Sequence, residues 1–229
     1  MDFQNKNYIY LDFETDTKGE FFIAGIKQNG AFNQVTLNPG LSGLASEHEM
    51  DLQTPSSFAK SLLQSADSHS VIVAYSIPER DLLRDLVTDG AKLYPDLKYL
   101  NLLRVAKRWV RDYRQDDFDL LPPFRKDPKR WGAKRLPNSL ASIMRLTDFP
   151  APFDYAPGKT STKFKTVKSA LEKKNQTYEL LTSKQKKKAT ESLKHNKFDV
   201  EALEVLLMEI IKTDSSLLKP QIKPLFLLN

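Results

Sequence analysis

The 229-residue chain contains no cysteine. It therefore cannot form a disulfide or a thiolate metal site, and any bound metal ion must be held by carboxylates, histidine or backbone oxygens. The N-terminus lacks the basic-then-apolar order of a signal peptide, and no stretch approaches the roughly 20 apolar residues that span a bilayer. These absences predict a cytoplasmic protein.

Acidic and basic residues are distributed unevenly along the chain. Residues 1–90 contain 6 Lys and Arg against 13 Asp and Glu, a net charge of −7, whereas the remaining residues have a net charge of +13. An acidic region joined to a basic one suits a metal-binding centre beside a surface for a polyanion such as nucleic acid. Solvated lysine-rich helices would give the same net charge.

The apolar pattern predicts an α/β domain that opens with an antiparallel three-stranded meander. Segments with the composition of strands lie at 8–14, 21–26, 35–37, 71–75 and 98–102. Asn29-Gly30 is a typical hairpin turn between the second and third of them. Segments with helical spacing lie at 54–66, 78–87 and 103–114. The expected core is a mixed five-stranded sheet flanked by helices.

The basic half is expected to form an insertion at about 115–194 within a single domain. Residues 116–137 and 149–162 are rich in proline or glycine and favour loops. A short helix at 138–146, capped by Asn138 or Ser139, lies between them. Lysine-rich helices at 163–193 then precede a final helix from about Asn196 to Lys212.

Asp12 and Glu14 lie two residues apart in the first predicted strand, so both side chains point to the same face. The apolar residues around them indicate a strand buried on both sides, where two like charges are costly unless a cation lies between them. Oxygen ligands suit Mg²⁺ or Mn²⁺. Alternatively, the strand end reaches solvent and both carboxylates are hydrated.

Asp199 falls within the apolar stripe of the final predicted helix. At about 100° per residue from His195, Asp199 lies near 40°, between Leu206 near 20° and Leu203 near 80°. A carboxylate on a core-facing side needs a partner such as a metal ion, and His195 can address the same site. Alternatively, Asp199 stabilises the helix start and His195 is a flanking polar residue.

Glu79 follows the buried strand at 71–75 and begins the next predicted helix. The carboxyl end of a strand is where α/β folds place site residues. Ser76 and Glu79 also have the spacing of a capping box, which would give Glu79 a structural role.

Together these motifs resemble the DEDD-type 3′–5′ exonuclease family of the RNase H-like superfamily. The first strand of that family carries Asp-x-Glu, as YLDFETD does at Asp12 and Glu14. Its last helix carries a histidine or tyrosine before the final aspartate, as HNKFDVEAL does at His195 and Asp199. Their four-residue spacing is usual for the tyrosine subclass.

The second motif of the family usually reads Asn-x-x-Phe-Asp. Here Ser76 replaces the asparagine, and the acid is Glu79 or Asp81. Glu79 is favoured because Leu83 then takes the apolar position four residues on. Asn101 stands where related proteins often have an aspartate.

The resemblance implies an RNase H-like fold and a 3′–5′ exonuclease acting on single-stranded DNA or RNA. In such an enzyme His195 would accept the proton of the attacking water, and four carboxylates would hold two ions. The four are Asp12, Glu14, Glu79 and Asp199. The alternatives are a catalytically degenerate module that binds nucleic acid or a protein partner, and a structure-selective endonuclease.

Basic residues provide a candidate surface for a phosphate backbone. Residues 159–197 contain 12 lysines against three glutamates, and the segment 125–135 interleaves basic residues with a tryptophan suited to stack on a base. The predicted contacts are Arg104, Arg108, Arg111, Lys129, Arg130, Trp131, Lys134 and Arg135. Alternatively, Trp109 and Trp131 anchor loops in the core and the lysines are solvated.

The tail at 214–229 is apolar but interrupted by two prolines, so it must pack on the body or bind a partner. A possible protein partner follows from its resemblance to sliding-clamp-binding peptides of bacteria, with one residue inserted. The residues that carry this resemblance are Gln221, Ile222, Leu225 and Phe226.

Overall fold

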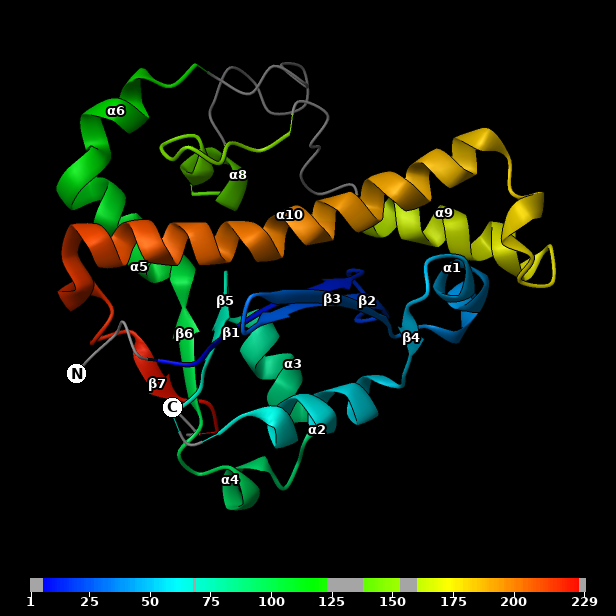
Figure 1. The fold of residues 1–229 in the computed structure, drawn as a ribbon, viewed down its shortest axis with the longest axis horizontal. Coiled ribbons are helices and arrows are strands. Elements are labelled where there is room, and N and C mark those ends of the chain that lie inside the picture. The colour runs from blue at the N-terminus through cyan, green and yellow to red at the C-terminus, as the bar shows by residue number, and fades with distance from the viewer. Residues whose placement is uncertain (1–5, 68, 123–137, 153–159, 227–229) are drawn as a thin grey trace.

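The computed structural model describes residues 6–67, 69–122, 138–152 and 160–226 (Figure 1). A mixed sheet in the order β4-β3-β2-β1-β5-β6-β7 lies between two layers of helices. The α/β fold and the opening antiparallel meander are confirmed. The described residues form seven strands, so the prediction of five was wrong.

The meander consists of β1 (Tyr8–Thr15), β2 (Phe21–Gln28) and β3 (Ala31–Thr36), each antiparallel to the next. Asn29 and Gly30 join β2 to β3 with φ angles of 51° and 79°. This left-handed backbone is what a two-residue type I′ turn requires, and asparagine and glycine adopt it most readily. The predicted hairpin is therefore confirmed.

The other strands extend the sheet on both sides. β5 (Val71–Ala74) runs parallel to β1, and β6 (Lys98–Asn101) runs parallel to β5; both strands were predicted from the sequence. The two unpredicted strands are the edges, β4 (Asp51–Leu52) and β7 (Ile222–Pro224). β4 is only two exposed residues and β7 ends in proline, which edge strands tolerate. β4 is held as a strand by its pairing with β3, and β7 by its pairing with β6.

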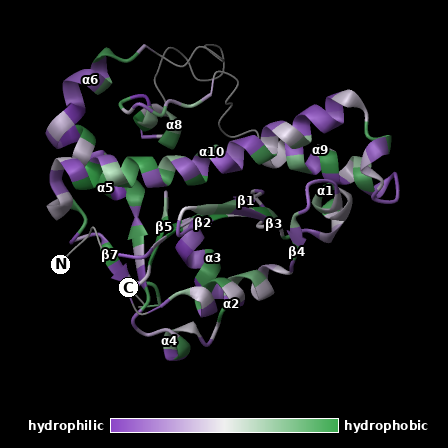
Figure 2. Cartoon of the chain, in the orientation of Figure 1, coloured by the Kyte–Doolittle hydropathy of each residue, from purple (hydrophilic) through white to green (hydrophobic). Residues whose placement is uncertain are grey.

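Helices cover both faces of the sheet (Figure 1). α2 (Pro55–Ser65) and α3 (Pro78–Leu86), two helices predicted from the sequence, lie together on one face. α5 (Leu102–Trp109) and α10 (Ser183–Asp214) lie on the other. Figure 2 shows that the residues of α10 over the sheet are more hydrophobic than those near its start. The C-terminal half of α10 thus forms the core.

α10 begins earlier than predicted. Thr182 and Gln185 form a capping box at its start, so the helix does not begin near Asn196, and the expected end of the insertion at 194 falls inside it. Its first half packs against α9 (Thr160–Glu172), which starts within the loop predicted at 149–162. Lysine and glutamine favour helices, and α9 supplies the apolar contacts that extend α10.

The helix predicted at 103–114 also continues further. α5 passes through a π-helical turn, η2 (Val110–Arg114), into α6 (Gln115–Leu120), where irregular structure was expected. Phe118 is buried in the core beside α10, which stabilises this extension. α8 (Leu140–Met144) follows Ser139, whose hydroxyl caps it. Residues 123–137 of the predicted loop lie outside the described residues.

The remaining elements are short. They are η1 (Pro39–Leu41), α1 (Ser42–Glu47), α4 (Gly90–Leu93), η3 (Tyr178–Leu180) and η4 (Ser215–Leu217). Beyond β7, Leu225 is fully buried and Phe226 packs against Gly90, so the described part of the tail packs on the body. Among the described helices, none is both sufficiently long and sufficiently apolar to cross a membrane.

Candidate metal centre

β1 directs alternate side chains to the two helix layers. The series packed toward α2 and α3 is Ile9, Leu11 and Phe13. Tyr8 and Tyr10 pack toward α10 instead. Asp12 and Glu14 continue this second series because strand residues alternate between faces. Both predicted carboxylates therefore lie on the α10 face, past the point where the pairing of β1 with β5 ends.

α10 brings His195 and Asp199 to the same place. Nε2 of His195 lies 3.2 Å from Oδ2 of Asp199, and the two side chains are 12% and 13% exposed. Ligand atoms of Glu14, His195 and Asp199 lie within 4.8 Å of one another. Two ligands of one Mg²⁺, each about 2.1 Å from the ion, lie at most about 4.2 Å apart. The observed spacing is close to that of a coordination shell.

Asp12 belongs to the same acidic cluster. Burial raises the pKa of its carboxyl well above the usual range, the charges of Asp199 and Glu79 raise it further, and a hydrogen bond from Asn196 opposes them. The pKa of Glu14 is also well above its usual range, first through burial and then through the charges of Asp12 and Asp199. Desolvated carboxylates that repel one another favour a bound cation.

Glu79 reaches the cluster from the first turn of α3. The Ser76 hydroxyl donates a hydrogen bond of 2.9 Å to its Oε2, while burial raises the pKa of Glu79. Ile77 is the N-cap of α3 and makes no side-chain capping bond, so the hydroxyl of Ser76 does not act as the cap. The Glu79 carboxylate accepts hydrogen bonds from the main chain of Glu79 and Ser76, which oppose the rise of its pKa. Asp81, the alternative acid, is 51% exposed and pairs with Arg80 and Arg84 at 3.3 and 3.8 Å.

Two other positions singled out from the sequence have structural roles. The Asn101 side chain accepts a hydrogen bond of 3.2 Å from the main-chain N–H of Arg104 and so caps α5. Trp109 is 1% exposed, and its indole N–H donates to the Thr213 hydroxyl at 3.2 Å. Trp109 is therefore buried in the core, as the alternative interpretation expected, but it belongs to α5 rather than to a loop.

The predicted arginine contacts lie on the surface of α5 and η2. Arg104, Arg108 and Arg111 are exposed. Asp112 pairs with Arg108 at 3.3 Å and with Arg111 at 2.7 Å, which reduces the positive charge of this face. The other predicted contacts lie outside the described residues, and they are Lys129, Arg130, Trp131, Lys134 and Arg135.

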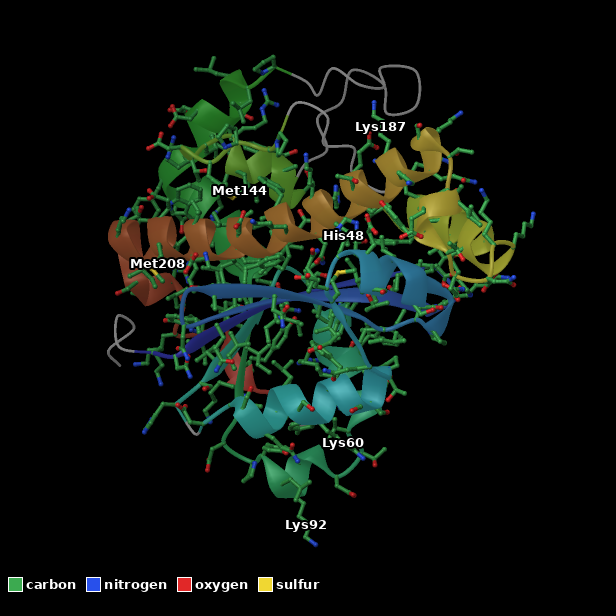
Figure 3. The ribbon with its side chains drawn as sticks, turned by 45° about the vertical axis from the view of Figure 1, so that its right-hand side comes forward. His48, Lys60, Lys92, Met144, Lys187 and Met208 are labelled. Atoms are coloured by element: carbon green, nitrogen blue, oxygen red, sulfur yellow. The ribbon has the colours of Figure 1, made fainter. Side chains whose placement is uncertain are left out.

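The lysines of α9 and α10 have two kinds of environment. Several form ion pairs within the fold, namely Lys163–Glu191, Lys165–Asp16 and Lys168–Glu20. These pairs fasten α9 to α10 and to the turn between β1 and β2. Lys187 is 77% exposed and projects from the first half of α10 (Figure 3). Lys187 also lies 4.0 Å from Glu191, but its exposure leaves it accessible to a phosphate backbone.

Asn196 is a residue of the cluster that the sequence predictions missed. It is fully buried, and its Nδ2 donates a hydrogen bond of 2.7 Å to Oδ2 of Asp12. At about 100° from His195, Asn196 lies between Leu203 near 80° and Leu207 near 120°. A polar amide inside the apolar stripe of α10 was the available signal.

Tyr75 links the surroundings of Asp199 to Asn138. Burial raises the pKa of the Tyr75 hydroxyl, and the charge of Asp199 adds to this effect. The same hydroxyl donates a hydrogen bond of 2.6 Å to the main-chain carbonyl of Asn138. Asn138 is three residues after Arg135 in the sequence, so the chain that follows the basic segment is anchored beside the cluster.

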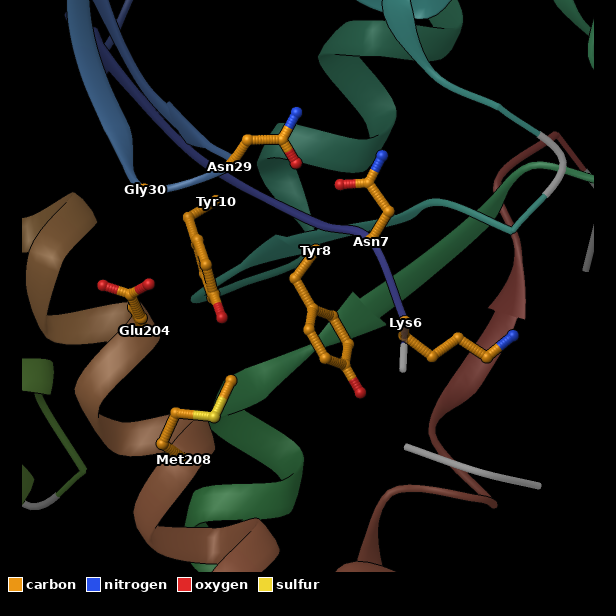
Figure 4. Close-up of a pocket in the computed structure, with 8 residues that line it drawn as sticks. All are labelled: Lys6, Asn7, Tyr8, Tyr10, Asn29, Gly30, Glu204 and Met208. Carbon is orange, nitrogen blue, oxygen red and sulfur yellow. The ribbon is translucent and has the colours of Figure 1, made fainter. Parts of the chain in front are cut away.

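A cleft of about 420 Å³ lies near the opposite end of β1 (Figure 4). Its lining residues are Lys6, Asn7, Tyr8, Tyr10, Asn29, Gly30, Glu204 and Met208. Tyr8 and Tyr10 are only 7% and 4% exposed, which leaves little ring surface for a ligand to stack on. No residue of the acidic cluster lines this cleft.

Comparison with known protein families, curated proteins and solved structures finds no match for this chain. The resemblance to the DEDD-type exonucleases thus stays a prediction from the sequence motifs.

Proposed function

We propose that this protein is a divalent-metal-dependent nuclease that removes nucleotides from the 3′-end of single-stranded DNA or RNA. The observation that supports this most strongly is that Glu14, His195 and Asp199 have ligand atoms within 4.8 Å of one another, and that four carboxylates from β1, α3 and α10 interact electrostatically there. They belong to Asp12, Glu14, Glu79 and Asp199. Without a bound cation, these carboxylates lower the stability of the folded protein. Such destabilising groups are expected at a functional site rather than at a structural one.

The donor set fits Mg²⁺ or Mn²⁺. It consists of carboxylate oxygens, and those of Glu14 and Asp199 already lie within 4.8 Å of each other, with an imidazole nitrogen of His195 within the same distance of both. In this proposal Asp12, Glu14, Glu79 and Asp199 hold two ions. Bound ions of this kind generate a nucleophile from water near neutral pH and stabilise the leaving 3′-oxygen.

His195 is the proton acceptor in this proposal. An imidazole exchanges protons near neutral pH, which suits it to take the proton of the attacking water. The Asp199 carboxylate, 3.2 Å from Nε2, would stabilise the imidazolium that forms. His195 is therefore expected to contribute to the rate more than to metal affinity.

The charge distribution supports a polyanionic substrate. Residues 91–229 carry a net charge of +13, and Lys187 is among their exposed lysines. Lysine contacts phosphate without reading the bases, so little sequence specificity is expected. The Tyr75 hydrogen bond to Asn138 places the chain after the basic segment next to the carboxylates.

An oligonucleotide assay tests the proposal. A 5′-labelled single strand of DNA or RNA is incubated with Mg²⁺ or Mn²⁺, and we expect stepwise shortening that EDTA abolishes. Asp12→Asn should lower the rate by on the order of 100-fold or more. Asp81→Asn, which alters an exposed acid on the same helix as Glu79, should retain activity.

The outcomes separate the alternatives. Unchanged cleavage by Asp12→Asn would refute the assignment of the site. Cleavage of a circular single strand, which has no ends, would indicate an endonuclease. Metal-independent binding without any cleavage would indicate a catalytically degenerate module.

A further inference from the structure

A relay of side-chain amides joins β3, α10 and β1. Nε2 of Gln34 donates hydrogen bonds to the main-chain carbonyl of Leu193 at 3.0 Å and to Oδ1 of Asn196 at 2.9 Å. Nδ2 of Asn196 then donates to Oδ2 of Asp12 at 2.7 Å. Asn196 is fully buried, so these hydrogen bonds satisfy both ends of its amide in place of water.

The chemistry of its ends fixes the direction of this relay. A main-chain carbonyl only accepts, so Gln34 must turn its amide nitrogen toward Leu193 and Asn196. Asn196 must then turn its oxygen toward Gln34 and its nitrogen toward Asp12. An ionised carboxylate also only accepts, so Asp12 requires the same orientation of Asn196 as the Leu193 carbonyl does. The relay therefore has a single self-consistent orientation.

A glycine in the middle strand leaves room for the relay. Asp12 is paired with Gly25 across β1 and β2, and Gly25 is paired with Gln34 across β2 and β3, so the three share one face. A Cβ at Gly25 would lie 2.3 Å from Oδ1 of Asn196 and 2.8 Å from Cγ2 of Val200. Only a residue without Cβ lets α10 approach closely, so that Asn196 can bond both neighbouring strands.

We propose that Asn196, held by Gln34, is a positioning residue that fixes the orientation of the Asp12 carboxylate for metal binding. This inference rests on the proposed metal centre. An amide donates a hydrogen bond without cancelling the charge of Asp12, whereas a lysine or arginine at this position would compete with the metal ion. Hydrogen-bond partners of metal ligands commonly tune affinity in this way.

Calorimetric titration with Mn²⁺ alone tests the relay without requiring catalysis. Asn196→Ala should weaken Mn²⁺ binding by about 10- to 100-fold. Gln34→Glu should also weaken it, because a carboxylate of the same size cannot donate to Asn196. Ser192→Ala is the matched control, because Ser192 is equally buried on α10 but bonds only the Lys188 carbonyl among the described contacts. Its affinity should stay within about twofold of wild type.

The double variant provides a sharper test. Because Gln34 acts through Asn196, Gln34→Glu should have no further effect on Mn²⁺ affinity in the Asn196→Ala background. A purely structural role for Asn196 predicts a lower Tm without metal but unchanged affinity, and that result would overturn the proposal. If Asn196→Ala does not fold, the Gln34→Glu variant decides instead. A Mn²⁺ affinity of this variant equal to that of wild type would overturn the proposal.

Failure of the relay is distinguishable from failure of the proposed function. If wild type binds Mn²⁺ and Asp12→Asn does not, whereas Asn196→Ala binds like wild type, only the relay is wrong. If wild type binds Mn²⁺ through Asp12 and Asn196 but cuts no nucleic acid, the relay stands and the nuclease proposal falls. If wild type does not bind Mn²⁺, both are wrong.

Discussion

The hydroxyl of Ser76 holds the carboxylate of Glu79 at 2.9 Å. The segment around Ser76 is itself fixed, because the Tyr99 hydroxyl donates to the Ser76 carbonyl. The orientation of Glu79 is therefore set before any ligand binds. Asp81, two residues later, turns to solvent and to arginines instead.

This difference predicts which acid of α3 matters. Glu79→Gln should lower kcat/KM on a single-stranded oligonucleotide by on the order of 10- to 100-fold, because it removes one carboxylate of the cluster. Ser76→Ala should cause a smaller loss, since only the orienting hydrogen bond disappears. Asp81→Asn, the control, should stay within about threefold of wild type. If Asp81→Asn were the more damaging change, Glu79 would not be the second-motif acid.

Replacing Asp12 by asparagine should stabilise the metal-free protein at neutral pH. Burial, followed by the charges of Asp199 and Glu79, raises the pKa of the folded Asp12 carboxyl. As the pH rises above about 4, the unfolded chain therefore ionises first and wild type loses stability, whereas below that pH the penalty is absent. Asp12→Asn removes this contribution, and its side-chain oxygen still accepts from Asn196.

Thermal unfolding in EDTA measures this effect. We expect a Tm roughly 2–4 °C above wild type near pH 7.5, the shift that about 1 kcal/mol gives in a domain of this size, and almost no difference near pH 3, where the unfolded carboxyl is also protonated. Added Mn²⁺ should raise the Tm of wild type but not that of the variant. A variant less stable than wild type in EDTA at neutral pH would argue against a strained carboxylate.

Gly25→Ala should destabilise the protein through crowding against α10. The new Cβ would lie 2.3 Å from Oδ1 of Asn196, a buried atom that cannot move without breaking its hydrogen bonds. Overpacking of this kind costs about 1–3 kcal/mol in the free energy of unfolding, measurable with urea. Ser192→Ala is a suitable control, because Ser192 is also fully buried on α10 and the change adds no atom there. Equal losses in both variants would contradict the prediction.

The ion pair between Lys165 and Asp16 should control the titration of Asp16. Hydrogen bonds from Lys165 and from the main chain of Glu20 and Lys18 lower the pKa of Asp16 to about 2. The contribution of ionised Asp16 to folding stability is fully present above about pH 3.9, the pKa of an aspartate in the unfolded chain. It is lost as the pH falls through about 2. In Lys165→Met the pKa of Asp16 should rise toward 3.9.

Carboxyl ¹³C chemical shifts followed against pH report this change directly. Lys187→Met is the control, because Lys187 is exposed and lies 4.0 Å from Glu191 rather than near Asp16. A pKa of Asp16 that does not change in Lys165→Met would mean that the main-chain hydrogen bonds alone lower it.

Local patterns predicted much of the fold and of the cluster. The Asn29-Gly30 turn and the two-residue spacing of Asp12 and Glu14 depend only on neighbouring residues, so both could be predicted. Asp199 was found in the same way, because the helical period places it in the apolar stripe. These predictions needed no knowledge of which elements pack together.

The features that were missed depend on distant contacts. β4 and β7 are strands only because β3 and β6 offer unpaired edges. The lysine-rich helix before residue 194 was predicted, but its continuity with the final helix in α10 was not. The role of Asn196 depends on Gln34 and Asp12, which lie on other elements. A sequence pattern indicates that a buried amide needs partners, but only the packing of α10 on the sheet determines which they are.

The hydrogen bond from Asn196 to Asp12 also has a kinetic consequence, because it joins positions 184 residues apart. Closing so long a loop costs conformational entropy that other contacts must offset, so we expect this hydrogen bond to form late in folding. A cation that strengthens it should therefore leave the refolding rate almost unchanged and slow the unfolding rate. A bound ion would therefore lengthen the lifetime of the folded domain without speeding its formation.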